Sequence, residues 1–192
     1  LFAAENNESL ISVCKYLSVD FNDSFNNFID EYDTKLMDPE SFFCEYHNYA
    51  YSSCFKIFKK MLFKNIRFPL GKLNEDAFVT YLILFAVDRI VYIDVPLYAY
   101  CYNCESIMRS RWTTRRLDEF EALSEQITFY RTHNYKSAFN RAVKDFALAA
   151  MLQYEQCKMV ADYEGLETIK RIMRNHIFKY HLIRMDNKYD LI

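Results

Sequence analysis

The fold is decided by residues 56–100, KIFKKMLFKNIRFPLGKLNEDAFVTYLILFAVDRIVYIDVPLYAY. The first part of this stretch predicts a short helix that ends near Phe63 and is followed by a loop. Apolar residues spaced i, i+3, i+4, i+7 from Phe78 onward predict a second helix, and Asn74 is suited to cap it. The β-branched run at 90–93 predicts a short buried strand.

The end of this stretch and the sequence before it predict further strands and one helix. The run LISVCKYLSV at 10–19 is rich in β-branched and aromatic residues and predicts a buried strand. Residues 97–102 alternate between two faces, which predicts a half-buried strand. Asp38 as N-cap and Pro39 at the first helical position predict a helix that runs to about Tyr49.

From Thr114 onward the sequence has long helical periodicity, with three successive apolar stripes. We therefore predict a mixed α/β region over residues 1–112, followed by an α-helical bundle over 113–192.

Composition and charge exclude several classes of protein. The 24 basic and 26 acidic residues nearly cancel, so we expect no nucleic-acid partner. Only two glycines are present, which argues against glycine-rich phosphate loops. No apolar run is long enough to span a bilayer, and no secretory signal is visible. The six dispersed cysteines favour reduced thiols, and so we expect a cytoplasmic protein.

Glu75 and Asp76 are the first candidates for chemistry. Two carboxylates in the first turn of a helix meet free backbone N–H groups and the positive end of the macrodipole. Both features lower a carboxylate pKa and keep the group ionised, as a general base must be. The alternative is structural, because helix starts favour acidic residues in any case.

This acidic pair is one of five ordered motifs. They resemble the acceptor-side block of family 2 glycosyltransferases, the enzymes that build bacterial surface polysaccharides. Order and spacing are both kept. The matching segments are Lys56–Phe63, Ile66–Gly71, Glu75-Asp76, Ile90–Tyr100 and Ser106-Ile107.

The resemblance implies a GT-A fold and transfer of a sugar, with inversion, from a nucleotide diphosphate sugar to a glycan or lipid-linked acceptor. By the same resemblance Asp76 is the general base and Glu75 orients the acceptor or the base. The family usually has an aromatic-Asn pair where this chain has Cys54-Phe55, which puts an acceptor contact there in doubt.

The D-x-D sequence of that family, which holds Mg²⁺ or Mn²⁺ against the leaving diphosphate, does not occur in this chain. We expect the chain to begin after the donor site of a longer enzyme. We also expect it to bind no metal and to be inactive alone.

Other residues have both a functional and a structural interpretation. Arg109 and Arg111, with the arginines at 115 and 116, form a basic cluster that could offset a donor diphosphate or simply be a solvated helix start. Trp112 could stack on a sugar or pack under the helices. Cys101 and Cys104 have the spacing of half a zinc site, without a second pair at a suitable distance.

Three further expectations remain. We expect Lys56, Lys59 and Lys60 to form a solvated face. The helices could instead make the chain a non-catalytic module for oligomerisation, as a homodimer, or for docking at the inner face of the membrane. A catalytically inactive homologue that keeps only the fold is another alternative.

Overall fold

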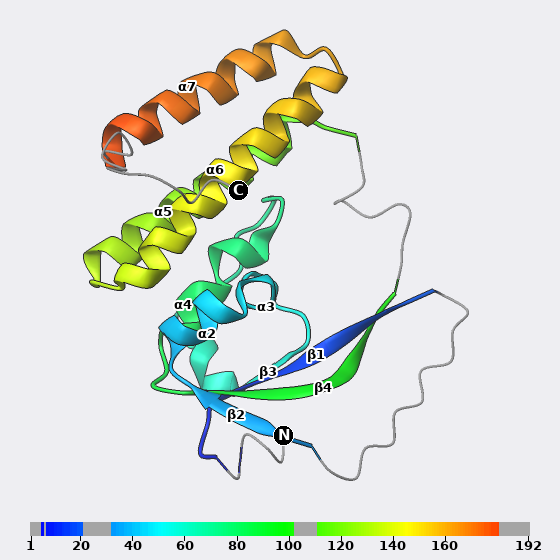
Figure 1. Ribbon diagram of the computed structural model, residues 1–192, viewed down its shortest axis with the longest axis vertical. Coiled ribbons are helices and arrows are strands. Elements are labelled where there is room, and N and C mark those ends of the chain that lie inside the picture. Colours follow the sequence, from blue (N-terminus) through cyan, green and yellow to red (C-terminus); the bar gives the residue numbers. More distant parts are fainter. Residues whose placement is uncertain (1–4, 6, 21–31, 102–110, 181–192) are drawn as a thin grey trace, which may run out of the picture.

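A computed structural model describes residue 5 and residues 7–20, 32–101 and 111–180, the last four without their side chains. A four-stranded sheet forms one end of the molecule, opposite the long carboxyl-terminal helices (Figure 1). The sheet order is β2-β4-β1-β3, with β1 and β4 parallel and the two outer strands antiparallel to their neighbours. The strands are β1 (Ile11–Val19), β2 (Thr34–Met37), β3 (Lys56–Phe58) and β4 (Ile90–Cys101).

The central pair β1 and β4 confirms the two apolar runs as strands. Val13 pairs with Tyr92, and the first residues of both strands are buried. The register shifts where Lys15 meets Pro96, because proline has no N–H to donate to the ladder. The segments at 90–93 and 97–102, predicted as separate strands, thus form one strand with an irregularity up to Cys101, and residue 102 lies outside the described residues.

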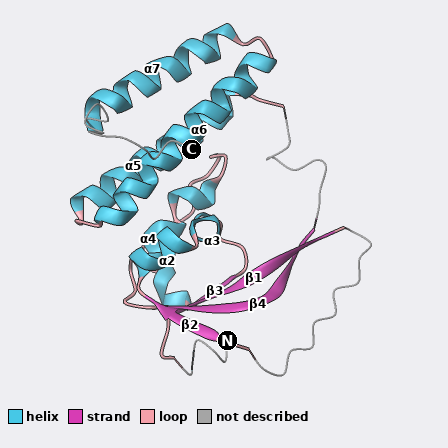
Figure 2. Cartoon of the chain, in the orientation of Figure 1, coloured by secondary structure: helices cyan, strands magenta, loops and turns pink. Residues whose placement is uncertain are grey.

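Short helices lie between the sheet and the bundle, as Figure 2 shows. They are α2 (Pro39–Glu45), α3 (His47–Tyr51) and α4 (Thr80–Leu84), with the 3₁₀ turns η1 (Lys60–Phe63) and η2 (Glu75–Phe78). Asp38 caps α2 as predicted, accepting from the Ser41 N–H at 3.0 Å. The predicted single helix to about Tyr49 is broken at Tyr46, whose backbone leaves the helical region.

Two predictions in the decisive stretch are wrong. Residues 56–58 form strand β3, because they pair antiparallel with Ile11–Val13; this long-range pairing overrides the local helical pattern. Asn74 adopts the left-handed conformation with φ 55° and makes no side-chain cap. A 3₁₀ turn therefore starts where a regular helix was predicted.

The carboxyl-terminal region contains the three predicted helices, preceded by a 3₁₀ turn, η4 (Thr114–Leu117). They pack as successive hairpins (Figure 1). Asn134 and Ala161, both with positive φ, lie in the two short connections. The helices are α5 (Asp118–Thr132), α6 (Lys136–Met159) and α7 (Tyr163–Tyr180). Within the described ranges, no helix is sufficiently long and apolar to cross a membrane.

One hydrophobic core runs from Ile11 in the sheet to Ile169 in α7. The mixed α/β class and the helical region are therefore confirmed. The same core crosses the boundary expected after Trp112, and the division into residues 1–112 and 113–192 stays a prediction.

A carboxylate of α2 caps the bundle helix α6 from outside. Glu40 Oε1 accepts from the N–H groups of Ser137 at 2.7 Å and Ala138 at 3.1 Å, both in the first turn of α6. We expect Glu40→Ala to lower the free energy of unfolding by about 1 kcal/mol, because those donors lose their acceptor. Urea denaturation measures the loss. Glu45→Ala is the control in the same helix, since its contact with Lys35 is exposed; equal losses in both variants would contradict the capping role.

Candidate functional site

The turn that carries Asp76 is held in place by α5. Asp118 Oδ2 accepts from the backbone N–H of Leu73 at 2.9 Å. The buried Gln126 donates from Nε2 to the carbonyl of Ala77 at 2.7 Å. Both ends of the acidic segment are thus bonded to one helix, which makes α5 the support of the candidate site.

Asp76 lies partly buried in this turn. Its Oδ1 accepts from the N–H of Ala77 at 3.0 Å and its Oδ2 from the N–H of Ser53 at 3.3 Å. Burial raises the pKa of Asp76, the N–H of Ser53 opposes this, and the nearby Glu75 raises it further.

The sequence-based expectation of a lowered pKa is therefore wrong for Asp76. A four-residue 3₁₀ turn has too few aligned peptides for a large macrodipole, and desolvation exceeds the effect of the two N–H groups. The raised pKa is compatible with a general base, because a carboxylate with a higher pKa is a stronger base once it is ionised. Glu75 itself is exposed on the adjacent surface.

Lys56 belongs to the same site, although the sequence pattern predicts only a solvated lysine there. Its Nζ donates to the carbonyls of Tyr49 and Ser52 and lies 4.6 Å from the centroid of the Phe55 ring. Burial lowers the pKa of Lys56 to about 7, and the charge of Asp76 opposes the decrease. The solvated-face interpretation is therefore wrong for Lys56.

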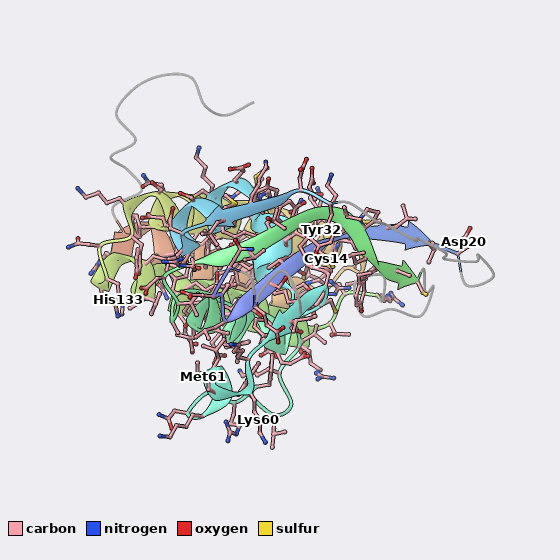
Figure 3. All side chains as sticks on the ribbon, turned by 90° about the horizontal axis from the view of Figure 1, so that it is seen from below. Cys14, Asp20, Tyr32, Lys60, Met61 and His133 are labelled. Carbon is pink, nitrogen blue, oxygen red and sulfur yellow. The ribbon has the colours of Figure 1, made fainter. Side chains whose placement is uncertain are left out.

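That interpretation is confirmed for Lys59 and Lys60, which are exposed. Figure 3 shows Lys60 and Met61 on a projection away from the sheet. Lys56 is the first residue of the first ordered motif, and this position could have marked it as a residue of the candidate site.

The predicted donor-side residues do not form one group. Arg109 lies outside the described residues. Arg111 is exposed, and Arg115 donates from Nη2 to the carbonyl of Gly71 at 3.2 Å. Trp112 is only 6% exposed and lies in the core, which corresponds to the packing alternative. The role of the arginines in binding a diphosphate stays a prediction.

Gly165 in α7 makes room for the Trp112 ring. A Cβ at this position would lie 2.5 Å from Trp112 Cη2 and 2.7 Å from Cys157 Sγ. We expect Gly165→Ala to destabilise the chain by about 1–3 kcal/mol through overpacking, although this change usually stabilises a helix. Trp112 is the single tryptophan, so its fluorescence during denaturation reports the loss locally. Glu164→Ala on the exposed face is the control; a Gly165→Ala variant as stable as that control would contradict the close approach.

The described residues contain no group of three or more His, Cys, Asp or Glu side chains placed to hold a metal ion. Cys101 is exposed at the end of β4, while Cys104, its partner in the half-zinc spacing, lies outside the described part of the chain. The divalent metal of the parent enzyme stays a prediction.

The chain is similar in sequence to a protein described as a glycosyltransferase. No family model matches the chain. It is 29% identical over 179 residues to the glycosyltransferase GlyA of Streptococcus pneumoniae serotype 4. The match covers 85% of this chain and 25% of that protein, so the chain spans about a quarter of the relative's length. Most of this chain is thus similar to one part of a known glycosyltransferase.

Proposed function

We propose that this chain is the acceptor-side part of an inverting glycosyltransferase of family 2, with a GT-A fold, and that Asp76 is its general base. The observation that carries the proposal is the partly buried Asp76 carboxylate, fixed by two N–H groups and raised in pKa. The relative named as a glycosyltransferase and the ordered motifs around Asp76 support it.

The proposed step is a single displacement. The acceptor hydroxyl loses its proton to an Asp76 carboxylate oxygen while the hydroxyl oxygen attacks the anomeric carbon. The bond from that carbon to the diphosphate breaks on the opposite face, and the nucleoside diphosphate leaves with the electron pair. Glu75 orients the acceptor. Within the described residues, no group of His, Cys, Asp or Glu side chains around Asp76 fits Mg²⁺ or Mn²⁺.

A second candidate function is supported by the outer face of α6. Its side chains Leu148, Met151, Leu152 and Met159 are each more than half exposed. Exposed apolar residues along one helix are typical of a surface that contacts another protein or a membrane. The corresponding function is a non-catalytic module for oligomerisation or docking.

An assay of the full-length parent protein separates the two. The protein is incubated with a panel of nucleotide sugars and acceptors, and release of nucleoside diphosphate is measured together with the glycosylated product. We expect acceptor-dependent release with at least one donor. A protein that forms stable oligomers but turns over no donor in the panel would contradict the enzymatic proposal. The isolated chain is expected to be inactive.

A further inference from the structure

The proposed mechanism uses Asp76 and gives Lys56 no role, although a mostly buried ammonium beside a catalytic carboxylate is costly. The ammonium makes charge-assisted bonds to the carbonyls of Tyr49 and Ser52. Tyr49 is in the last turn of α3 and Ser52 is its C-cap. Lys56 thus satisfies carbonyls that a helix end leaves without partners.

One peptide group connects Lys56 to Asp76. The carbonyl of Ser52 accepts from Lys56 Nζ, and the N–H of Ser53 donates to Asp76 Oδ2 at 3.3 Å. These two groups belong to the same planar peptide unit, so a cation that fixes the oxygen also fixes the direction of the N–H. Hydrogen bonding to the ammonium polarises the peptide and strengthens its N–H as a donor.

The backbone around this peptide is held in an unusual conformation. Phe55 has φ 49°, in the left-handed region that non-glycine residues rarely adopt. Its carbonyl accepts from the N–H of Cys14 in β1 at 3.0 Å. The segment 52–56 is therefore fixed to the sheet on one side, and through Lys56 and Ser53 to α3 and Asp76 on the other.

We propose that Lys56 is a positioning residue for the Asp76 carboxylate, acting through the Ser52–Ser53 peptide and through its own positive charge, which favours the ionised form of Asp76. This inference rests on the proposed function of Asp76 as the base.

The charged and titratable groups around the pair come from three segments. Asp76, Cys54 and Cys14 interact with Lys56, and Glu75 interacts with Asp76. Because burial lowers the pKa of Lys56 to about 7, the ammonium loses its charge as the pH rises through neutrality. Above that pH the positive charge no longer stabilises the Asp76 carboxylate.

Carboxyl carbon NMR of the 192-residue chain tests the inference without any activity. In the wild type we expect the Asp76 side-chain carbon to titrate once for its own proton. We expect a second, smaller shift at the pH at which the Lys56 Cε resonance titrates. Lys56→Met should remove this second shift and move the first to higher pH, while Lys56→Arg should keep the first near its wild-type position. Lys59→Met, an exposed lysine close in the chain, is the matched control and should change neither.

The pH–rate profile of the parent enzyme gives the functional readout. Lys56→Met should lower kcat about 10- to 100-fold and move the acid limb to higher pH, because the base is misplaced and harder to ionise. A wild-type Asp76 resonance that does not respond to the Lys56 titration would overturn the inference, even if Lys56→Met fails to fold. If the NMR coupling is present but Asp76→Asn is fully active, the function proposed for Asp76 fails and the inference fails with it. If Asp76→Asn is inactive and no coupling is seen, only the inference fails.

Discussion

Asp76→Asn is expected to reduce sugar transfer by the parent enzyme about 10²- to 10⁴-fold, the usual contribution of a positioned general base. The amide keeps the size of the carboxylate, and its one oxygen can still accept from the N–H of Ser53, although the N–H of Ala77 then loses its acceptor. It cannot remove the proton of the acceptor hydroxyl. Donor binding, measured by calorimetry with the nucleotide sugar, should be unchanged.

Two controls separate loss of the base from loss of the fold. Asp88→Asn removes an exposed carboxylate nearby in the chain and should leave the rate unchanged. Burial raises the pKa of Asp76, so the stability that this group contributes is present at low pH and is lost as the pH rises through its folded pKa. The neutral Asn side chain avoids that loss, which offsets the lost bond from the Ala77 N–H, so Asp76→Asn should keep the stability of the wild type at pH 7 to within about 1 kcal/mol. A fully active Asp76→Asn enzyme would rule out Asp76 as the base.

Phe43→Ala is expected to lower the free energy of unfolding by about 3–5 kcal/mol, the cost of truncating a buried aromatic residue. Phe43 in α2 is 1% exposed. Its ring centroid lies 5.0 Å from that of Tyr130 in α5, 5.6 Å from Tyr51 and 6.3 Å from Phe85. The ring therefore joins the short helices over the sheet to the bundle, and its loss leaves a cavity where they meet.

Tyr163→Ala is the matched control, since it truncates an aromatic side chain that is 77% exposed. We expect it to change the stability by less than about 0.5 kcal/mol. Guanidinium denaturation followed by circular dichroism measures both variants. If the two variants lose similar amounts, the junction between sheet and bundle does not depend on Phe43.

The sequence predicts those elements whose signal is local and long. Strand β1 follows from a run rich in β-branched and aromatic residues, and β4 follows from two neighbouring runs that are predicted as separate strands. Helices α5, α6 and α7 follow from apolar periodicity sustained over many turns. Glu75 and Asp76 could be selected as a candidate site from the ordered motifs around them.

What the sequence does not predict depends on distant partners. Residues 56–58 become a strand only because β1 offers them an edge. The ammonium of Lys56 is drawn into the protein because the carbonyls of Tyr49 and Ser52 converge on it, and one-dimensional spacing does not show this convergence. The raised pKa of Asp76 likewise depends on how much protein surrounds the turn.

The parallel pairing of β1 with β4 has a consequence for biosynthesis. Everything between Val19 and Ile90 is made before β1 can meet its central neighbour. Until then, β1 can pair only with β3, the shorter partner that leaves the ribosome earlier. The nascent chain therefore carries β1 with an open edge until β4 is made, a state in which chains are prone to pair with one another. The sheet can be complete only after Cys101 has been made, and a pause in translation before that point should increase the demand for chaperones.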